Sequence, residues 1–291
     1  MDGSRAYAAR RGMDVLSEAL FPCGQCEGCR VEHAAQWKTR CLHELKSHDA
    51  ASFLSLTYDD AHLPEHGSLR YSDVQKFFRR LRRSGQKFRF FCCGEYGSTT
   101  FRPHYHVICY GLDFKEGSQP LANSPSGHGR YFNQALTDLW GHGSVDIGSV
   151  TSESIGYVTQ YALKKVNGDR AEAHYRVVDP DTGEISHRVP EFIQMSRSPG
   201  IGGLFLERFA SDVQGGYAVV DGRKVPVPKA YLRRFDRELT PALVQRLDDA
   251  DYERFLMAST PQAVLDRSPE RLAVRKQVLL ARQGAKKRVY G

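Results

Sequence analysis

An apolar run near residue 105 constrains the fold of this 291-residue chain more than any other feature. The segment His104–Tyr110 reads HYHVICY, and its β-branched and aromatic residues are typical of a buried strand. Side chains alternate between the two faces of a strand, so His104 and His106 share one face. The opposite face carries the apolar set Tyr105, Val107 and Cys109. The chain must therefore build a sheet that buries the apolar face and gives the two imidazoles polar partners.

The pattern on either side of this run predicts a mixed α+β fold. Strands are expected at Phe53–Tyr58, Phe88–Cys93, His104–Tyr110 and Ser144–Val150, and helices at Val31–Lys46, Tyr71–Arg83, Asn133–Trp140 and Glu153–Val166. After the first helix, the order β-α-β-β-α-β-α is typical of a split antiparallel sheet with helices packed on one face. The Gly/Ser/Pro-rich segment Asp113–Gly129 is expected to be a loop.

The sequence suggests three parts. Residues 1–48 hold a cysteine cluster and a helix, residues 49–210 hold the sheet, and residues 211–291 form a hairpin and a helical, basic C-terminal extension. Two turn signals, DPDTGE and VVDGRKV, are flanked by β-prone residues and predict hairpins. From about Thr240 the pattern is helical and charged, and we expect its end, ARQGAKKRVYG, to be a mobile basic tail.

The charge of the chain predicts a polyanionic partner. The formal net charge is +7 and the pI is near 9.0, which is compatible with nucleic-acid binding. The helix expected at Tyr71–Arg83 has an apolar stripe on one side and basic residues on the rest of its surface. Its candidates for DNA contact are Arg79, Arg80, Arg82 and Arg83. The alternative is a solvated basic face.

No part of the sequence resembles a membrane segment or a signal peptide. No apolar run reaches the roughly 18 residues of a membrane span, and the first dozen residues, MDGSRAYAARRG, lack an apolar centre. An intracellular location is therefore expected. The sequence also contains no GxxxxGK[ST], so we expect no P-loop and no built-in ATP-driven motor of that type.

Four of the seven cysteines suggest a metal site near the N-terminus. The stretch PCGQCEGCR places Cys23, Cys26 and Cys29 close together, and CxxC is a usual half of a zinc site. A second CxxC at the usual distance is missing, so zinc would need Cys41 or His33 as its fourth ligand. The alternative is a reduced turn without metal. The other three cysteines lie in apolar, strand-like runs that predict buried thiols: Cys92, Cys93 and Cys109.

The histidine pair suggests a different metal site. Imidazoles two residues apart on a strand can share one ion, and a carboxylate would complete an N/N/O site with open positions. Glu95 is the candidate, because a hairpin would return His104 and His106 alongside it. Mg²⁺ or Mn²⁺ at such a site can polarise a phosphoryl oxygen. The alternative is a pair of half-exposed histidines on a sheet surface.

A second element favours the catalytic interpretation. In the helix segment ESIGYVTQYALKKV, about 100° per residue places Tyr157, Tyr161 and Lys164 on one face, with Lys165 at its margin. A lysine one turn from a phenol favours the phenolate and stabilises charge that develops on a phosphate. Standing alone, the segment could also be an amphipathic helix with ordinary surface tyrosines.

Together these motifs resemble those of HUH endonucleases, the initiators of rolling-circle replication. His104-Tyr105-His106 has the histidine–hydrophobic–histidine form, and Tyr157-x-x-x-Tyr161 followed by two lysines is similar to their tyrosine motif. More narrowly, the chain resembles the replication initiation proteins of Microviridae of the gokushovirus type. The matching stretches are PCGQCEGCR, FLSLTYDDAHLP, GEYG…RPHYHVI, YVTQYALKK and MSRSPGIGG.

The resemblance implies an HUH fold over residues 49–210 and a site-specific DNA nickase and ligase. A tyrosine would attack a phosphodiester of single-stranded origin DNA, keep the 5′ end as a phosphotyrosyl link and later rejoin the strand. Tyr161 would act first and Tyr157 second, with Lys164 as an electrostatic aid. Mg²⁺ or Mn²⁺ would sit at the histidine site. Lys165 and the basic helix would contact DNA without reading its sequence.

The resemblance also implies where the protein works. It would act in the cytoplasm of the bacterial host, and because it has no P-loop, a host helicase and the host replication machinery would be its partners. Two alternatives stay open: an HUH transposase or relaxase, and a non-catalytic, zinc-stabilised single-stranded DNA-binding protein. Relaxases usually carry the nucleophile before a three-histidine cluster, and here the order is reversed.

Overall fold

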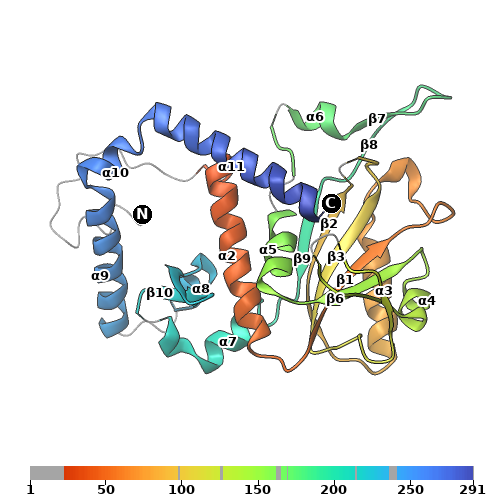
Figure 1. Cartoon of the computed structure of the whole chain (residues 1–291), viewed down its shortest axis with the longest axis horizontal. Coiled ribbons are helices and arrows are strands. Elements are labelled where there is room, and N and C mark those ends of the chain that lie inside the picture. The colour runs from red at the N-terminus through yellow and green to blue at the C-terminus, as the bar shows by residue number, and fades with distance from the viewer. Residues whose placement is uncertain are drawn as a thin grey trace.

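A seven-stranded antiparallel sheet forms the centre of the protein, as the computed structural model shows (Figure 1). The structure describes residues 23–97, 99–124, 127–161, 165–168, 170–213, 215–235 and 241–290. In spatial order the strands are β4 (Gln119–Leu121), β5 (Arg130–Phe132), β6 (Val145–Ser149), β1 (Ala51–Thr57), β3 (Pro103–Tyr110), β2 (Arg89–Tyr96) and β9 (Phe192–Met195). Each neighbouring pair is antiparallel. The predicted α+β class with an antiparallel sheet is confirmed.

The register of the central strands brings the histidines beside the expected carboxylate. His104 on β3 lies opposite Glu95 on β2, and His106 lies between Ser55 on β1 and Cys93 on β2. The sequence of β1 is ASFLSLT, and its two leucines are fully buried on the other face. The period of two thus sorts apolar and polar side chains onto opposite faces of the same three strands.

One face of the sheet, called the apolar face below, is closed by α3 (Tyr71–Arg83) and α4 (Gln134–Trp140). The apolar stripe of α3 is buried against this face and consists of Val74, Phe77, Phe78 and Leu81. Asn133 caps the start of α4, since its side chain accepts a hydrogen bond from the backbone N–H of Leu136. These two helices begin and end close to the predicted residues because amphipathic spacing and capping are local signals.

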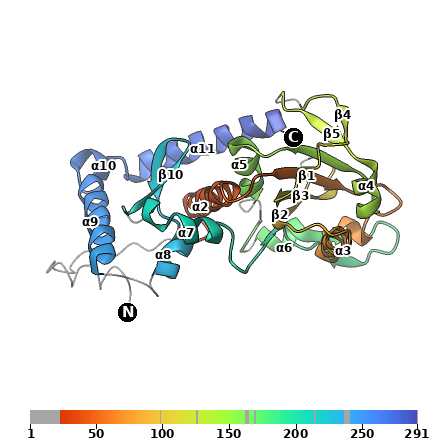
Figure 2. The same cartoon turned by 90° about the horizontal axis from the view of Figure 1, so that it is seen from below.

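The other face carries the histidines and is called the site face; α2 (Glu27–Leu45) and α5 (Ser152–Gln160) cover it (Figures 1 and 2). Cys41 of α2 and Ile155 of α5 join Phe91 and Ile108 in its buried cluster. Helices therefore lie on both faces of the sheet, rather than on the one face expected. The reason is that β3 carries apolar residues in both phases, and each face needs a cover that removes this surface from water.

Three other expectations change along the chain. The loop expected at Asp113–Gly129 contains the short edge strand β4, which pairs with β5. The helix expected to reach Val166 ends earlier: α5 stops at Gln160, and residues 165–168 are not helical. Gly168 has a φ of +70°, a conformation that ends helices. The C-terminal basic tail is helical, because α11 (Pro269–Tyr290) continues through it.

The C-terminal part has a small core of its own. α7 (Gly203–Arg208), α8 (Lys229–Phe235) and the hairpin of β10 (Tyr217–Val220) and β11 (Arg223–Pro226) share the buried residues Phe205, Leu206, Val213, Ala218, Val227 and Tyr231. Both predicted hairpins are confirmed, the other being β7 (Arg176–Val178) with β8 (Ile185–His187), which follows α6 (Arg170–Tyr175).

Beyond this core, α9 (Pro241–Ala258) lies far from the sheet, and α10 (Pro261–Leu265) leads into α11, which returns past the start of α2 (Figure 1). An ion pair of 3.3 Å between Lys276 Nζ and Glu27 Oε1 joins α11 to α2. None of the helices in the described ranges is both long and apolar enough to cross a membrane.

Candidate active site

Three side chains from adjacent strands converge on the site face. Glu95 Oε1 lies 2.8 Å from Nε2 of His104 and 3.0 Å from Nε2 of His106. Glu95 is 1 % exposed and His106 is 6 % exposed, whereas His104 is half-buried. The three groups offer ligand atoms that all lie within 4.8 Å of one another. The structure thus brings together the three residues that the sequence proposed as a metal site.

The outer nitrogen of each imidazole is held by another group. Nδ1 of His104 lies 3.2 Å from the backbone carbonyl of Arg102, and Nδ1 of His106 lies 3.0 Å from Oγ of Ser55. A carbonyl oxygen only accepts, so His104 donates through Nδ1, and in the neutral ring an Nε2 lone pair then faces Glu95. Lone pairs facing a carboxylate favour a cation between them. The donor set of two nitrogens and one oxygen fits a divalent ion that keeps open positions.

Glu95 remains ionised in this setting. Burial by itself raises the pKa of its carboxyl group, but the hydrogen bonds and charge of His104 and His106 outweigh burial. The net result is a pKa well below the ordinary value of a glutamate. A carboxylate that stays negative while almost fully buried is suited to binding a cation.

Helix α5 places two tyrosine rings on His106. The helix starts with a capping box, in which Thr151 and Ser154 exchange side-chain–backbone hydrogen bonds. The ring of Tyr161 is stacked on that of His106, and the ring of Tyr157 meets it at a steep angle; both centroid distances are 5.3 Å. The two tyrosine rings lie 4.7 Å apart. The predicted i, i+4 pair therefore shares one neighbour, and that neighbour belongs to the candidate metal site.

The two phenols differ in exposure, and both resist ionisation. Tyr161 is only 6 % exposed, whereas Tyr157 is half-buried and lines a cavity. Burial raises the pKa of both phenols above the ordinary value, and the nearby Glu95 carboxylate raises both further. Neither tyrosine is a strong nucleophile by itself at neutral pH, so its use in catalysis needs positive charge close to the phenolic oxygen.

Of the two lysines that follow Tyr161, Lys164 lies outside the described residues. The side chain of Lys165 is exposed. The backbone carbonyl of Lys165 accepts a hydrogen bond of 2.7 Å from the guanidinium of Arg30 on α2. The chain just after the tyrosines is thereby attached to the start of α2.

A cavity of about 310 Å³ opens beside His106 and Tyr157. The ring of Phe53 forms part of its lining and stacks on His106 at a centroid distance of 5.5 Å. Arg130 and Asp146, which are paired with each other, line the same cavity. An aromatic ring beside hydrogen-bonding groups is the combination that binds an unpaired base.

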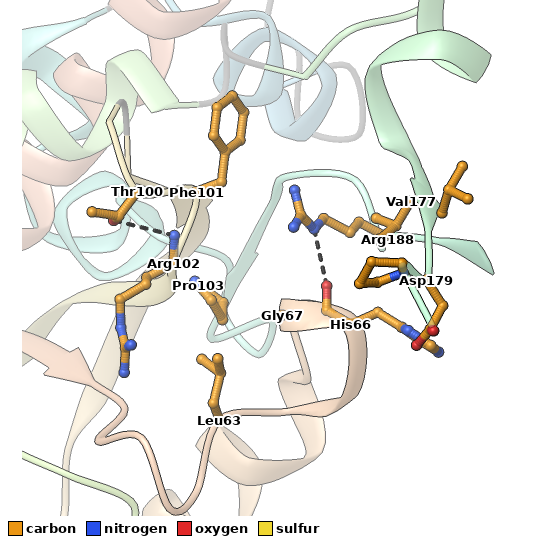
Figure 3. A pocket seen from close by; sticks show the side chains of 12 residues that line it. Leu63, His66, Gly67, Thr100, Phe101, Arg102, Pro103, Val177, Asp179 and Arg188 are labelled. Atoms are coloured by element: carbon orange, nitrogen blue, oxygen red, sulfur yellow. Dashed lines mark hydrogen bonds between the residues drawn. The ribbon is translucent and has the colours of Figure 1, made fainter. Parts of the chain in front are cut away.

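A second pocket, of about 330 Å³, lies at the turn that connects β2 to His104 (Figure 3). Phe101 from this turn and Arg188 from beyond the β7–β8 hairpin both line it, and the guanidinium carbon of Arg188 lies 5.8 Å from the Phe101 ring centroid. Phe101 is 46 % exposed and has a φ of +51°, which is unusual for a bulky residue. Backbone strain of this kind is concentrated at functional sites.

The basic helix α3 does not contribute to this site, because it packs on the apolar face. Arg80 donates hydrogen bonds to the carbonyls of Leu139 and Trp140 and so joins α3 to the end of α4. Arg82 lies over the ring of Phe88 at 4.6 Å. The remaining two candidates, Arg79 and Arg83, are exposed on the same helix. Contact between these arginines and a longer DNA stays a prediction.

The four cysteines proposed as zinc ligands separate into two places. Cys23, Cys26 and Cys29 lie together, whereas Cys41 is fully buried in the cluster of the site face. Cys29 and Cys41 belong to the same continuous helix, and their twelve-residue spacing corresponds to about 18 Å along its axis. Cys41 therefore cannot complete the cluster. Burial raises the pKa of its thiol to about 12, as expected for a core residue.

Two residues of the site were not expected from the sequence. Ser55 fixes the ring of His106, and Phe53 stacks on that ring. Both lie on β1 in the phase opposite to the buried leucines, so the alternation of ASFLSLT already marks them as facing away from the apolar core. What the sequence does not contain is the register that sets Ser55 opposite His106.

Comparison with known proteins gives a consistent result. A family model of replication-associated proteins, described by the name ORF2, matches residues 51–166. The replication-associated protein VP4 of Bdellovibrio phage phiMH2K is 30 % identical over 240 residues, which cover 79 % of this chain and 71 % of the relative.

Two further relatives carry similar names. The replication-associated protein ORF2 of Spiroplasma virus 4 is 28 % identical over 75 % of this chain and 68 % of its own length. The replication-associated protein ORF4 of Chlamydia phage 1 is 34 % identical over 50 % of this chain and 38 % of its own length. No solved structure gives a significant match.

Proposed function

Since the chain belongs to the replication-associated protein family of the Microviridae, the gokushovirus type of replication initiator, we propose that it is a DNA nickase and strand-transferase. The observation that carries this proposal is the packing of Tyr157 and Tyr161 on His106, a member of the Glu95–His104–His106 group. Two potential nucleophiles beside a candidate divalent-metal site suit phosphodiester transfer better than they suit DNA binding alone.

The metal proposed for this site is Mg²⁺ or Mn²⁺, held by Glu95, His104 and His106. When bound, such an ion neutralises charge on the scissile phosphate and favours the phenolate of an adjacent tyrosine. The residues around the site position its ligands: the Arg102 carbonyl and Ser55 orient the two rings, so that both Nε2 atoms face Glu95.

In the proposed reaction, the oxygen of Tyr161 attacks a phosphorus atom of the single-stranded origin. The P–O bond to the 3′ oxygen breaks as the bond to the tyrosine forms, and the phenol loses its proton. The products are a free 3′ hydroxyl, which primes DNA synthesis, and a 5′ end linked to the protein. Lys164 would support the developing charge.

The second tyrosine explains how the reaction could close. After one round, Tyr161 is already esterified, so Tyr157 would attack the regenerated origin while the first link persists. The freed 3′ hydroxyl would then attack the Tyr161 ester and release a closed single-stranded circle. The 4.7 Å separation of the two rings supports sequential use of one site.

Several features support DNA as the ligand. The net charge is +7, and the cavity at Phe53 and the pocket at Phe101 offer aromatic rings with nearby guanidinium groups on two sides of the histidines. We further propose that the protein acts in the host cell and relies on a host helicase, because the sequence has no P-loop.

A nicking assay tests the proposal most directly. End-labelled, overlapping single-stranded fragments of the phage genome are incubated with the protein and Mn²⁺, and then separated under denaturing conditions. We expect cleavage of one fragment and a covalent protein adduct on its 5′-phosphate side. The double variant Tyr157→Phe/Tyr161→Phe should give no adduct, while the control variant Tyr217→Phe, in the distant β10–β11 hairpin, should behave like the wild type. Absence of any adduct with every divalent ion tested would instead support a non-catalytic single-stranded DNA-binding protein.

A further inference from the structure

Three cysteine thiols come together at the start of α2, far from the residues proposed for catalysis in sequence. Sγ of Cys23 lies 4.0 Å from Sγ of Cys29, and all three thiols, including that of Cys26, lie within 4.8 Å of one another. Gly24 has a φ of +73°, which allows the tight turn that brings them together. The backbone N–H of Cys26 donates to Sγ of Cys23 at 3.2 Å, a bond that favours a thiolate.

The surroundings of these thiols differ from those of the other cysteines. Cys23 and Cys26 are exposed and Cys29 is half-buried, whereas the remaining four are fully buried in the two clusters of the sheet: Cys41, Cys92, Cys93 and Cys109. Packing explains the buried thiols, because free cysteine behaves as a small apolar side chain. Packing does not explain three neighbouring thiols at the surface, and one disulfide would use only two of them.

A fourth ligand of suitable chemistry lies one helical turn further on. His33 follows Cys29 by four residues on α2, so both side chains are on one face of the helix. Both also line a cavity of about 460 Å³, together with Gly24 of the cysteine turn. The first 22 residues contain no cysteine or histidine that could compete for this position.

We propose that Cys23, Cys26, Cys29 and His33 bind one structural zinc ion. The spacing C-x₂-C-x₂-C-x₃-H places the first two thiols in a turn and the last two ligands on a helix, which is the arrangement of many zinc sites. His33 Nε2 accepts a hydrogen bond of 3.0 Å from Nε1 of Trp37. Coordination through this nitrogen replaces that hydrogen bond, so zinc binding also changes the environment of the Trp37 indole.

The proposed zinc site is connected to the candidate active site through Arg30. This residue lies one position after Cys29 and donates to the carbonyl of Lys165, just beyond the tyrosines. Zinc fixes the first turn of α2 and therefore the base of Arg30. Arg30 is thus a positioning residue for the segment that carries Tyr161, and it touches neither the metal nor the DNA in this role.

Metal stoichiometry tests the proposal without DNA, so its outcome is independent of the proposed nicking activity. The full chain is purified under reducing conditions without chelator, and its zinc content is measured. We expect one zinc per chain, an equal exchange with Co²⁺ that gives thiolate-to-metal charge-transfer absorption, and a change in tryptophan fluorescence on zinc removal. The Co²⁺ spectrum uses the unmodified protein and does not depend on whether a variant folds.

Matched variants assign the ligands. Cys26→Ser should lose zinc, and His33→Ala should weaken zinc binding at least about tenfold. Gln25→Ala, an exposed residue in the same turn, should bind zinc like the wild type. Wild-type protein that takes up neither zinc nor Co²⁺, or that contains a Cys23–Cys29 disulfide under reducing conditions, overturns the proposal. Full zinc affinity in His33→Ala overturns the assignment of the fourth ligand.

The link through Arg30 is tested separately. Arg30→Ala should keep its full zinc content but expose the 165–168 segment to faster proteolysis than in the wild type. Unchanged proteolysis with full zinc content would show that the hydrogen bond does not transmit order from the zinc site.

Discussion

On strand β3, the apolar face and the site face differ in what their side chains contact. Tyr105, Val107 and Cys109 meet the aromatic and aliphatic residues of α3 and α4. On the other face, His106 meets a carboxylate, a serine hydroxyl and three aromatic rings. Because the faces alternate along one strand, the rigidity of the first face fixes the geometry of the second. This arrangement places ionisable groups at hydrogen-bonding distances without depending on a flexible loop.

The comparison can be broken first at His106, where we expect the largest effect. In His106→Ala, the candidate site loses one metal ligand and the ring on which both tyrosines pack. Nicking should fall at least about 100-fold, as when other groups that stabilise a transition state are removed. Binding to single-stranded DNA should persist, since it rests on contacts with many phosphates. Near-normal nicking by this variant, measured as covalent adduct per minute, would remove His106 from the proposed site.

The tyrosines give the next largest effect and separate two steps. Tyr161→Phe should strongly reduce the first cleavage, because Tyr161 is stacked on His106 and is one turn before Lys164. Tyr157→Phe should cleave once but fail to release closed circles. The first step is measured as adduct on a single-origin strand, and the second as circles from a strand with two origins. Exchanged phenotypes would reverse the order of use, and normal behaviour of Tyr157→Phe in both assays would make Tyr157 a packing residue.

Glu95 should show a smaller effect that depends on metal concentration. Glu95→Gln keeps the shape of the side chain but removes its negative charge. The Mn²⁺ concentration that gives half-maximal nicking should rise on the order of tenfold or more, and saturating Mn²⁺ should restore much of the rate. A titration of nicking rate against Mn²⁺ measures this shift. The same half-maximal concentration in both proteins would mean that another residue completes the metal site.

How far the sequence predicts this arrangement depends on the range of each signal. The helix at Tyr71–Arg83, the alternation on β3 and the tyrosine spacing are local, and the structure has each of them close to the expected residues. Which side of a sheet a helix covers is a long-range property. The amphipathic stripe of α3 therefore predicted its buried side but not that its arginines would lie on the apolar face.

The cysteines show the same division. The turn that gathers Cys23, Cys26 and Cys29 is encoded within a few residues, and the sequence identified it. The exclusion of Cys41 depends on α2 starting at Glu27 and running without a break, which spacing alone does not reveal. Likewise, Ser55 becomes part of the site only through the pairing of β1 with β3.

Val107 sharpens the comparison from the apolar face. It is fully buried beside His106 in sequence but points to the opposite side. Val107→Ala should lower the free energy of unfolding by about 2 kcal/mol, from lost apolar burial and the space left behind. The nicking rate per folded molecule should not change. Urea denaturation gives the first quantity, and adduct formation well below the melting temperature gives the second. A loss of nicking without a loss of stability would contradict the assignment of separate roles to the two faces.

The smallest effect concerns the helix that covers the site face. α2 meets the sheet through Cys41, and on another side His43 packs into the C-terminal core, where its ring stacks on that of Phe205 at 4.0 Å. Burial lowers the pKa of His43 to about 4 from an ordinary value of 6.5. The folded protein therefore favours the neutral ring, and the unfolded chain takes up a proton first as the pH falls.

It follows that the stability contributed by neutral His43 is complete above pH 6.5 and is lost as the pH falls from 6.5 toward 4. One such group changes the free energy of unfolding by at most about 1.4 kcal/mol per pH unit. His43→Gln does not titrate, so its stability should fall less steeply than that of the wild type over this range. Urea denaturation of both proteins at several pH values measures the two slopes. Parallel slopes would show that His43 is protonated equally in the folded and unfolded states, and that acid does not loosen α2 at this contact.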